Sequence, residues 1–421
     1  MTDDDVEVLV IGAGLAGLRC AGVLAAAGRE VRVWEGGDDV GGRVRTDVVD
    51  GFRCDRGFQV LNPAYPELQA CVDLDALRLR PFAAGVAVRR ERDSVVLAHP
   101  LREPARIPKM LASGMIRPRE AFGLGRWAAG ALRPHTVKSG HGDGTVRERL
   151  DRCGARGELR RVVDRFLAGV VLEDTGATSN AFCLLLARMF VLGVPGLPAD
   201  GMRALPQQLA APLQSRITLG QKATHVEHDG SRWTVRGPDA VVRARDVVVA
   251  TDPVAAAALT GHPRPPVMHG VVTDWWAADE APSSLSMLWV DGRPRPPGPV
   301  LNTAVISAAA PSYAPPGRHL ISASALLTAG GAAPEESTTR RHAADVLGAD
   351  GRDWRLLKRH VVQEALPAQP PPLRVRRPVR VREGLWWCGD HRDTASIQGA
   401  LVSGRRTAEQ ILRQRPPTAP S

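Results

Sequence analysis

Three glycines and one glutamate near the N-terminus have the types and spacing of a dinucleotide-binding site. Gly12, Gly14 and Gly17 form the pattern G-x-G-x-x-G, and Glu35 lies 23 positions after the first of them. The first glycine of such a pattern makes a tight turn, the second lets the backbone approach a pyrophosphate, and the third lets a helix pack on a sheet. A carboxylate at this distance suits the hydroxyl groups of a ribose. These four residues therefore predict that the chain binds a dinucleotide.

The elements that must position these residues can be predicted from the same stretch. Residues 7–11 form an apolar run typical of a buried strand, 15–27 predict a helix, and 30–34 predict a second strand. The N-terminus of the helix would favour an anion. A signal peptide or a membrane span is the alternative for so apolar a stretch. The acidic residues at 3–5 and the charge of Arg19 argue against both.

A second glycine-rich turn follows the carboxylate directly. It reads EGGDDVGGRVRT and has Gly41, Gly42 and Arg43 at its centre. Paired glycines allow an unusual backbone path, and an arginine can bind a phosphate through two N–H groups. The alternative is a surface loop with an incidental arginine. The position of the turn immediately after Glu35 favours a role in the nucleotide site.

Composition limits the class of protein. The 421 residues are 44% hydrophobic and 24% charged, which is typical of a globular protein of one or two domains. The net charge of +10 comes from arginines dispersed along the chain, so we expect no nucleic-acid partner. The six cysteines lack metal-ligand spacing, and we expect no metal. Without an export signal we expect a cytoplasmic protein, and peripheral contact with the inner face of a membrane stays open.

With these two turns, the sequence resembles the FAD-dependent amine oxidase and phytoene desaturase superfamily, whose members carry a Gly-Gly-Arg turn after the βαβ unit. The resemblance implies that the dinucleotide is FAD. The next segment, DGFRCDRGFQVL, is similar to the family's hairpin beside the flavin ring. The resemblance therefore places Arg56, Gly57, Phe58 and Gln59 near the isoalloxazine.

Two stretches in the middle of the chain also fit the family. The segment RITLGQKATHVEHDGSRWTVRG alternates around an Asp-Gly turn and predicts a β-meander. It resembles the family strand whose backbone meets the adenine, which implies that role for Ala223. Residues 247–250 then predict a buried strand followed by a helix. Family members close the nucleotide domain with such a strand, which here ends at Thr251.

The last matching stretch is LWWCGDHRDTASIQGALVSGRRTAEQIL, a short strand, a loop and a long helix. In the family, the acidic residue after the glycine binds the ribityl chain, which implies this role for Asp390 after Gly389. The helix N-terminus would point its N–H groups at the N1–C2 edge of the flavin. Reduced flavin is negative there, and a helix N-terminus stabilises an anion. The residues concerned are Ser396, Ile397 and Gln398.

The motifs and the resemblance together imply one set of residues that contact the cofactor. No second dinucleotide pattern was found, so NAD(P)H is not expected as a built-in reductant. The set is Gly12, Ala13, Gly14, Leu15, Ala16, Gly17, Glu35, Gly36, Gly42, Arg43, Arg56, Gly57, Phe58, Gln59, Ala223, Thr251, Gly389, Asp390, Ser396, Ile397 and Gln398.

The resemblance implies an α/β fold: a Rossmann-type FAD-binding domain with a parallel sheet and a β-meander, and an inserted α+β substrate domain. We expect the FAD-binding domain to comprise residues 1–61, 200–263 and 379–413, and the substrate-binding domain 62–199 and 264–378. Residues 414–421 would form a flexible tail. Residues 104–134 mix basic and apolar side chains. They would form either an interfacial helix pair that admits a lipid-soluble substrate or ordinary packed amphipathic helices.

The reaction implied first is hydride transfer from an apolar, isoprenoid- or polyene-like substrate to flavin N5, with oxygen or a quinone as the electron acceptor. Amine oxidation is an alternative, although residues 265–327 lack the lysine typical of amine oxidases. Isomerisation of a polyene without net redox, and a flavin-binding scaffold without turnover, also stay open. Four residues are candidates for the pocket beside the flavin: His391, Trp275, Trp276 and Met202. The alternative for His391 is a structural hydrogen bond near the phosphates or the ribityl chain, and the alternative for the two tryptophans is core packing.

Overall fold

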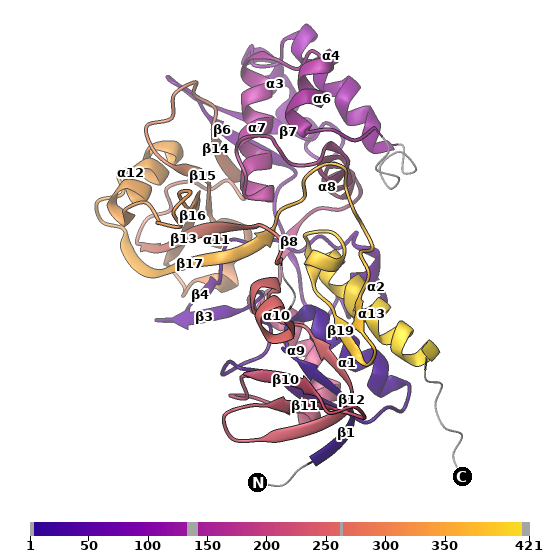
Figure 1. The fold of residues 1–421 in the computed structure, drawn as a ribbon. Coiled ribbons are helices and arrows are strands. Elements are labelled where there is room, and N and C mark those ends of the chain that lie inside the picture. The colour runs from indigo at the N-terminus through magenta and orange to yellow at the C-terminus, as the bar shows by residue number, and fades with distance from the viewer. Residues whose placement is uncertain (1–3, 133–141, 262–263, 415–421) are drawn as a thin grey trace.

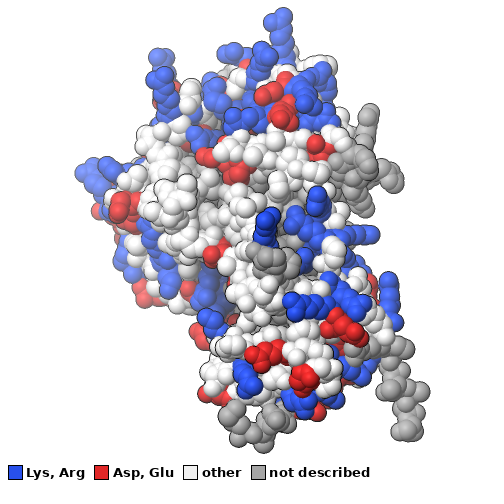
Figure 2. Space-filling view, viewed as in Figure 1, with Lys and Arg blue, Asp and Glu red and all other residues white. Residues whose placement is uncertain are grey.

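The computed structural model describes residues 4–132, 142–261 and 264–414 (Figure 1). Figure 1 shows a mixed sheet near the two termini, a second sheet beyond it, and a group of helices at the far end. Figure 2 shows basic side chains over much of the face in view, with acidic side chains between them. The predicted tail lies almost entirely outside the described residues, since the last helix ends at Gln414.

The first sheet is the predicted parallel sheet with its meander. In the described residues it has eight strands, in the order β10-β11-β12-β1-β2-β9, and β19 pairs with both β12 and β18. The pairs of β1 with β2 and with β12 are parallel, whereas β10, β11 and β12 form the antiparallel meander. Its strands are β1 (Asp4–Ile11), β2 (Val31–Trp34), β9 (Ile217–Thr218), β10 (His225–His228), β11 (Trp233–Arg236), β12 (Val241–Val249), β18 (Arg380–Arg382) and β19 (Leu385–Trp387).

The predicted βαβ unit is confirmed, with boundaries that differ by three residues or fewer. The first helix, α1 (Leu15–Ala26), links β1 and β2. Gly12 has a φ of +107°, which residues with a side chain rarely adopt. A Cβ on Gly17 would lie 2.0 Å from the Gly12 carbonyl oxygen. Both glycines are thus required by the turn and by the packing of α1 on the sheet.

The C-terminal helix, α13 (Ile397–Gln414), packs directly against α1. A Cβ on Gly404 would lie 2.2 Å from the Ala16 carbonyl oxygen, so this crossing requires a glycine. The contact joins the two ends of the chain beside the glycine-rich turn.

The second sheet is largely antiparallel and has seven strands in the described residues. Its order is β17-β13-β16-β15-β14-β6-β7, and only the β14–β6 pair is parallel. Two short pairs, β3–β4 and β5–β8, stand apart from both sheets. The strands are β3 (Thr46–Val49), β4 (Phe52–Asp55), β5 (Arg80–Pro81), β6 (Gly85–Arg89), β7 (Ser94–Ala98), β8 (Gly196–Leu197), β13 (Met268–Ala278), β14 (Leu288–Asp291), β15 (Val300–Val305), β16 (His319–Leu326) and β17 (Arg355–Pro367).

The remaining helices surround these sheets. Helices α3 and α4 lie within residues 104–134, where helices were predicted. Helix α8 is buried in its first half, and its last two residues are exposed. None of the described helices is long and apolar enough to cross a membrane. The helices are α2 (Pro66–Cys71), α3 (Ile107–Ala112), α4 (Pro118–Ala128), α6 (Val146–Arg152), α7 (Gly157–Val171), α8 (Asn180–Leu192), α9 (Ala204–Ala210), α10 (Pro253–Thr260), α11 (Ile306–Ala309) and α12 (Glu336–Leu347).

Three separate segments supply the parallel sheet, namely residues 4–34, 217–249 and 380–387. The strands of the second sheet come from residues 85–98 and 268–367. The limits predicted for the two domains stay a prediction.

The crossing of α1 and α13 predicts a clear difference between two glycines. Gly404→Ala should lower the free energy of unfolding by about 1–3 kcal/mol, because the new methyl group overlaps the backbone of α1. Gly22→Ala in α1 is the matched control, since no atom lies within 4 Å of the position of its Cβ. That control should be neutral or stabilising by up to about 1 kcal/mol. Urea unfolding with FAD in fixed excess measures both, and equal effects would contradict the account.

Candidate active site

A cavity of about 1650 Å³ extends from the glycine-rich turn into the space between the second sheet and helices α7 and α8. Most of the residues predicted to hold the cofactor line it, although they come from segments far apart in the sequence. These lining residues are Gly12, Gly14, Leu15, Ala16, Glu35, Gly36, Gly42, Arg43, Arg56, Gly57, Phe58, Gln59, Ala223, Thr251, Gly389, Asp390, Ser396 and Ile397.

Glu35 is held in place where β2 ends. One carboxylate oxygen accepts a hydrogen bond from the Ala13 N–H at 2.7 Å, and the other accepts from the Gly37 N–H at 2.8 Å. Two backbone donors fix the direction of the carboxylate without neutralising it. Its charge therefore stays at the cavity, where the hydroxyl groups of a ribose would find an acceptor.

Arg43 and Asp390 meet at the cavity, although 347 positions separate them in the chain. Arg43 Nη2 lies 2.7 Å from Asp390 Oδ1, and its Nη1 donates to the Ala365 carbonyl at 2.9 Å. The Gly41 N–H donates to the Ala13 carbonyl at 2.8 Å, which joins the two glycine-rich turns. The structure thus brings together two motifs that the sequence supplied separately.

The segment after β4 lies along the cavity and contacts the second sheet. The Phe58 N–H donates to Thr273 Oγ1 on β13 at 3.3 Å. Gln59 Nε2 donates to the Arg43 carbonyl at 2.9 Å, whereas its Oε1 is buried with no hydrogen-bond partner in the described residues. A buried acceptor without a donor is costly, and a ligand that brings an N–H group would satisfy it.

Arg56 is positioned by a carboxylate of the β3–β4 hairpin that also contacts the second sheet. Its Nε and Nη2 lie 3.1 and 3.0 Å from Asp47 Oδ1 on β3. His360 Nε2 on β17 lies 2.9 Å from Asp47 Oδ2. Burial alone would raise the pKa of Asp47, but the hydrogen bonds from His360 and Arg56 lower this pKa to about 2. Asp47 is therefore charged at neutral pH and holds the guanidinium of Arg56 at the cavity.

These features fit FAD. The helix α1 begins at Gly14 without a side-chain cap or an acidic residue in its first turn, so its N–H groups are available to a phosphate. No atom lies within 4 Å of the place where a Cβ of Gly14 would be. Glu35 offers acceptors to a ribose, and the free Gln59 Oε1 offers one to an N–H group of the flavin ring. Arg43 would meet the pyrophosphate charge.

Three residues of the predicted cofactor set do not line the cavity. Ala13 and Gly17 are buried in the turn and in the contact of α1 with the sheet. Gln398 Oε1 accepts from the Glu67 N–H at 3.0 Å and ties α13 to α2. These three residues shape the site, and direct contact of each with the cofactor stays a prediction.

The four candidates for the pocket beside the flavin are not among the residues that line the cavity, and a role for them beside the flavin stays a prediction. Trp275 and Trp276 are fully buried in two different cores, because both faces of β13 are covered. Met202 is also fully buried, and its N–H donates to Asp55. Burial lowers the pKa of His391 to about 3, so its ring is uncharged at neutral pH.

Several lining residues were missed by the sequence analysis. Lys222 and Asp252 stand beside the predicted Ala223 and Thr251, and their position one residue away was a usable signal. Asp252 also caps α10 through bonds from the N–H groups of Val254 and Ala255. Asn302 and Ser324 come from the second sheet, and no local pattern could have placed them at the cavity.

The part of the cavity beyond the predicted flavin segment is lined mainly by apolar side chains. Helices α7 and α8 contribute most of them, and Phe166 meets Phe190 with ring centroids 5.4 Å apart. Among the described lining residues, the carboxylates are Glu35, Asp252 and Asp390, all at the nucleotide end. The apolar residues from the two helices are Leu159, Val163, Phe166, Leu167, Val170, Leu186, Ala187, Met189 and Phe190, and Leu172 directly follows α7.

The sequence profile of the flavin containing amine oxidoreductases matches residues 15–412, and the chain belongs to this family. It is therefore a flavin-dependent oxidoreductase, and its cofactor is FAD. The α/β fold with a parallel sheet and an antiparallel second sheet is the fold of flavin amine oxidases.

Individual relatives agree with this assignment. Putrescine oxidase of Kocuria rosea is 30% identical over 284 residues, which cover 59% of this chain and 57% of that protein. Mycobacterium tuberculosis AofH, whose name describes it as a flavin-containing monoamine oxidase, is 26% identical over 293 residues. These residues cover 64% of this chain and 62% of AofH. Each match thus spans less than two thirds of the relative. The structure of a fatty acid isomerase from P. acnes has a TM-score of 0.69, at 15% identity over 99% of this chain and 100% of that chain.

Glu35 provides the first test of the cofactor site. Glu35→Ala should weaken FAD binding by about 1–3 kcal/mol per lost buried hydrogen bond, because the ribose would lose its acceptor. Glu30→Ala is the matched control, since this exposed carboxylate lies just before β2 and does not line the cavity. Equilibrium titration of the apoprotein with FAD measures both dissociation constants. Unchanged FAD binding in Glu35→Ala would show that the carboxylate does not hold the ribose.

Proposed function

We propose that this enzyme oxidises a largely apolar substrate that lies in the cavity beneath α7 and α8. The bound cofactor supplies the acceptor for a hydride. The residues of the chain bind and orient the substrate and exclude water from it. A polyene or another isoprenoid-like molecule is the substrate class that such a cavity suits best.

The observation that carries this proposal is the distribution of charge along the cavity. Beyond the nucleotide end, the described lining residues include no carboxylate, and the charged side chains there are Arg56 and Arg102. Burial of apolar surface would supply the binding energy, at about 0.8 kcal/mol for each methylene group. A substrate with a positive charge at the end far from the flavin would leave that charge buried without a partner, which costs several kcal/mol.

Amine oxidation is the second candidate, and the named relatives support it. The cavity restricts which amine is suitable, because a diamine such as putrescine carries a distal ammonium group that no described carboxylate would meet. A hydrophobic monoamine that reacts as the neutral base would meet no such penalty. Lys222 is the lysine among the described lining residues, and it lies beside Gly36 at the nucleotide end. Isomerisation of a polyene without net redox is a third candidate, supported by fold likeness alone.

The cavity has an exposed rim through which a substrate could enter. The cavity reaches exposed residues at Pro100 and Arg102, where Arg102 donates to the Val191 carbonyl at 2.9 Å. The side chains of Leu101, Val191 and Leu192 around this place are apolar and more than half exposed. We propose that this rim contacts a membrane surface from which an apolar substrate enters. Oxygen or a quinone would then reoxidise the flavin.

Anaerobic titration of the holoenzyme distinguishes the candidates by the visible band of the flavin. We expect detergent-dispersed polyenes or hydrophobic monoamines to bleach it, and diamines to leave it unchanged. Bleaching by diamines would contradict the proposed apolar class. Bleaching by monoamines and not by polyenes would make amine oxidation the function. If no compound bleaches the band, pre-reduced enzyme that isomerises a polyene would replace oxidation with isomerisation.

A further inference from the structure

A group of arginines lies outside the cavity, on two loops that α13 holds together. Arg406 on α13 is mostly buried and donates to the Arg377 carbonyl at 3.0 Å and to the Arg392 carbonyl at 3.2 Å. It also lies 3.1 Å from Asp393 Oδ2. This one side chain therefore fixes residues 374–377 beside residues 390–394.

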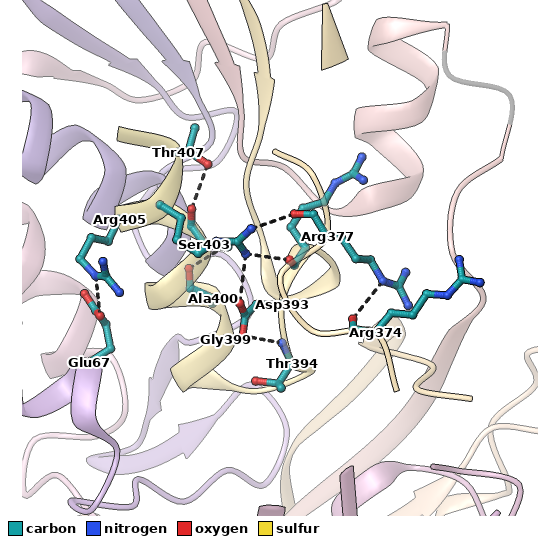
Figure 3. A network of polar contacts seen from close by, with 12 residues as sticks. Glu67, Arg374, Arg377, Asp393, Thr394, Gly399, Ala400, Ser403, Arg405 and Thr407 are labelled. Atoms are coloured by element: carbon teal, nitrogen blue, oxygen red, sulfur yellow. Dashed lines mark hydrogen bonds and ion pairs between the residues drawn. The ribbon is translucent and has the colours of Figure 1, made fainter. Parts of the chain in front are cut away.

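One carboxylate, Asp393, lies near the guanidinium groups carried by these loops. Burial raises its pKa, and the charges of Arg406 and Arg376 lower it. Within the described residues, Arg374, Arg376, Arg377 and Arg392 form no ion pair, whereas the nearby Asp393 pairs with Arg406. Figure 3 shows the side chains of Arg374 and Arg377 extending away from α13. On the other side of α13 the charges are compensated, because Arg405 pairs with Glu67 at 2.8 Å. The excess positive charge is thus local to one side of the helix.

The same groups are close enough to disturb one another. Burial, and then the charge of Arg377, lowers the pKa of Arg392 to about 10. Burial and the charge of Arg374 also lower the pKa of Arg377. Arg392 lies over the ring of Trp387 at 4.2 Å, and its Nε is buried without a hydrogen-bond partner in the described residues. An anion between these groups would satisfy the free donors and relieve the repulsion.

We propose that Arg374, Arg376, Arg377 and Arg392 form a binding site for a phosphate group, separate from the FAD site. Several guanidinium groups in one place match the geometry and charge of a phosphate, which each can bind through two N–H groups. None of the four lines the cavity. In the sequence, the buried His391 separates Arg392 from Asp390, and Asp390 lines the cavity. The proposal does not depend on the reaction proposed above.

The phosphate can come from a free phosphorylated molecule or from the headgroup of an anionic phospholipid. Inorganic pyrophosphate serves as the probe for the first source. Vesicles of phosphatidylglycerol, compared with vesicles of phosphatidylcholine, serve for the second. The FAD-loaded enzyme is used throughout, so that the phosphate site of the cofactor is filled.

The first experiment is calorimetric titration of the holoenzyme with pyrophosphate at constant ionic strength. We expect saturable binding of one pyrophosphate, and a dissociation constant that rises at least about tenfold in the double variant Arg377→Gln/Arg392→Gln. The matched control is Arg119→Gln/Arg341→Gln, which removes from α4 and α12 two exposed arginines that form no ion pair with any described residue. The flavin spectrum and thermal unfolding show whether each variant is folded. Heats that do not saturate, or an equal loss in the control, would overturn the proposal.

The vesicle experiment then identifies the source. Cosedimentation with phosphatidylglycerol vesicles that pyrophosphate reverses, and that Arg377→Gln/Arg392→Gln removes, would assign the site to a lipid headgroup. Pyrophosphate binding without such cosedimentation would assign it to a free phosphorylated molecule. Vesicle binding that survives in the double variant, together with no binding of pyrophosphate, would exclude a phosphate site at these arginines.

Discussion

The contact between α1 and α13 is the constraint on which the site depends. The two helices come within backbone contact because Gly404 has no side chain, and α1 reaches the sheet because Gly17 has none. This contact places the loop before α13 against the N-terminal turns, where Arg43 and Asp390 form an ion pair at 2.7 Å. Residues from both ends of the chain thus line one cofactor cavity.

A second link carries this geometry to the substrate side. The β3–β4 hairpin meets the second sheet through Asp47 and His360, and the following segment meets it through Phe58 and Thr273. The cavity therefore continues from a polar end, built on backbone N–H groups and fixed charges, into an end built from the apolar faces of α7 and α8. We infer that the cofactor occupies the polar end of the cavity and that the substrate occupies the apolar end.

The nucleotide half of the site could be predicted from the sequence because its signals are local. The turn at Gly12 needs a positive φ, and Glu35 follows at a distance set by one helix and one strand. The substrate half could not be predicted in this way. Whether Trp275 faces a cavity or a core depends on which layers cover β13, and both faces are covered. Asn302 and Ser324 reach the cavity only through the pairing of the second sheet.

The most direct test of the account compares n-alkylamines with α,ω-diamines of equal length. Their dissociation constants can be measured anaerobically from the visible spectrum of the bound flavin. We expect each added methylene to tighten alkylamine binding roughly fourfold, which corresponds to about 0.8 kcal/mol, and a second ammonium group to abolish binding. Affinity that is independent of chain length, or diamines that bind as tightly as the alkylamines, would contradict an apolar substrate site.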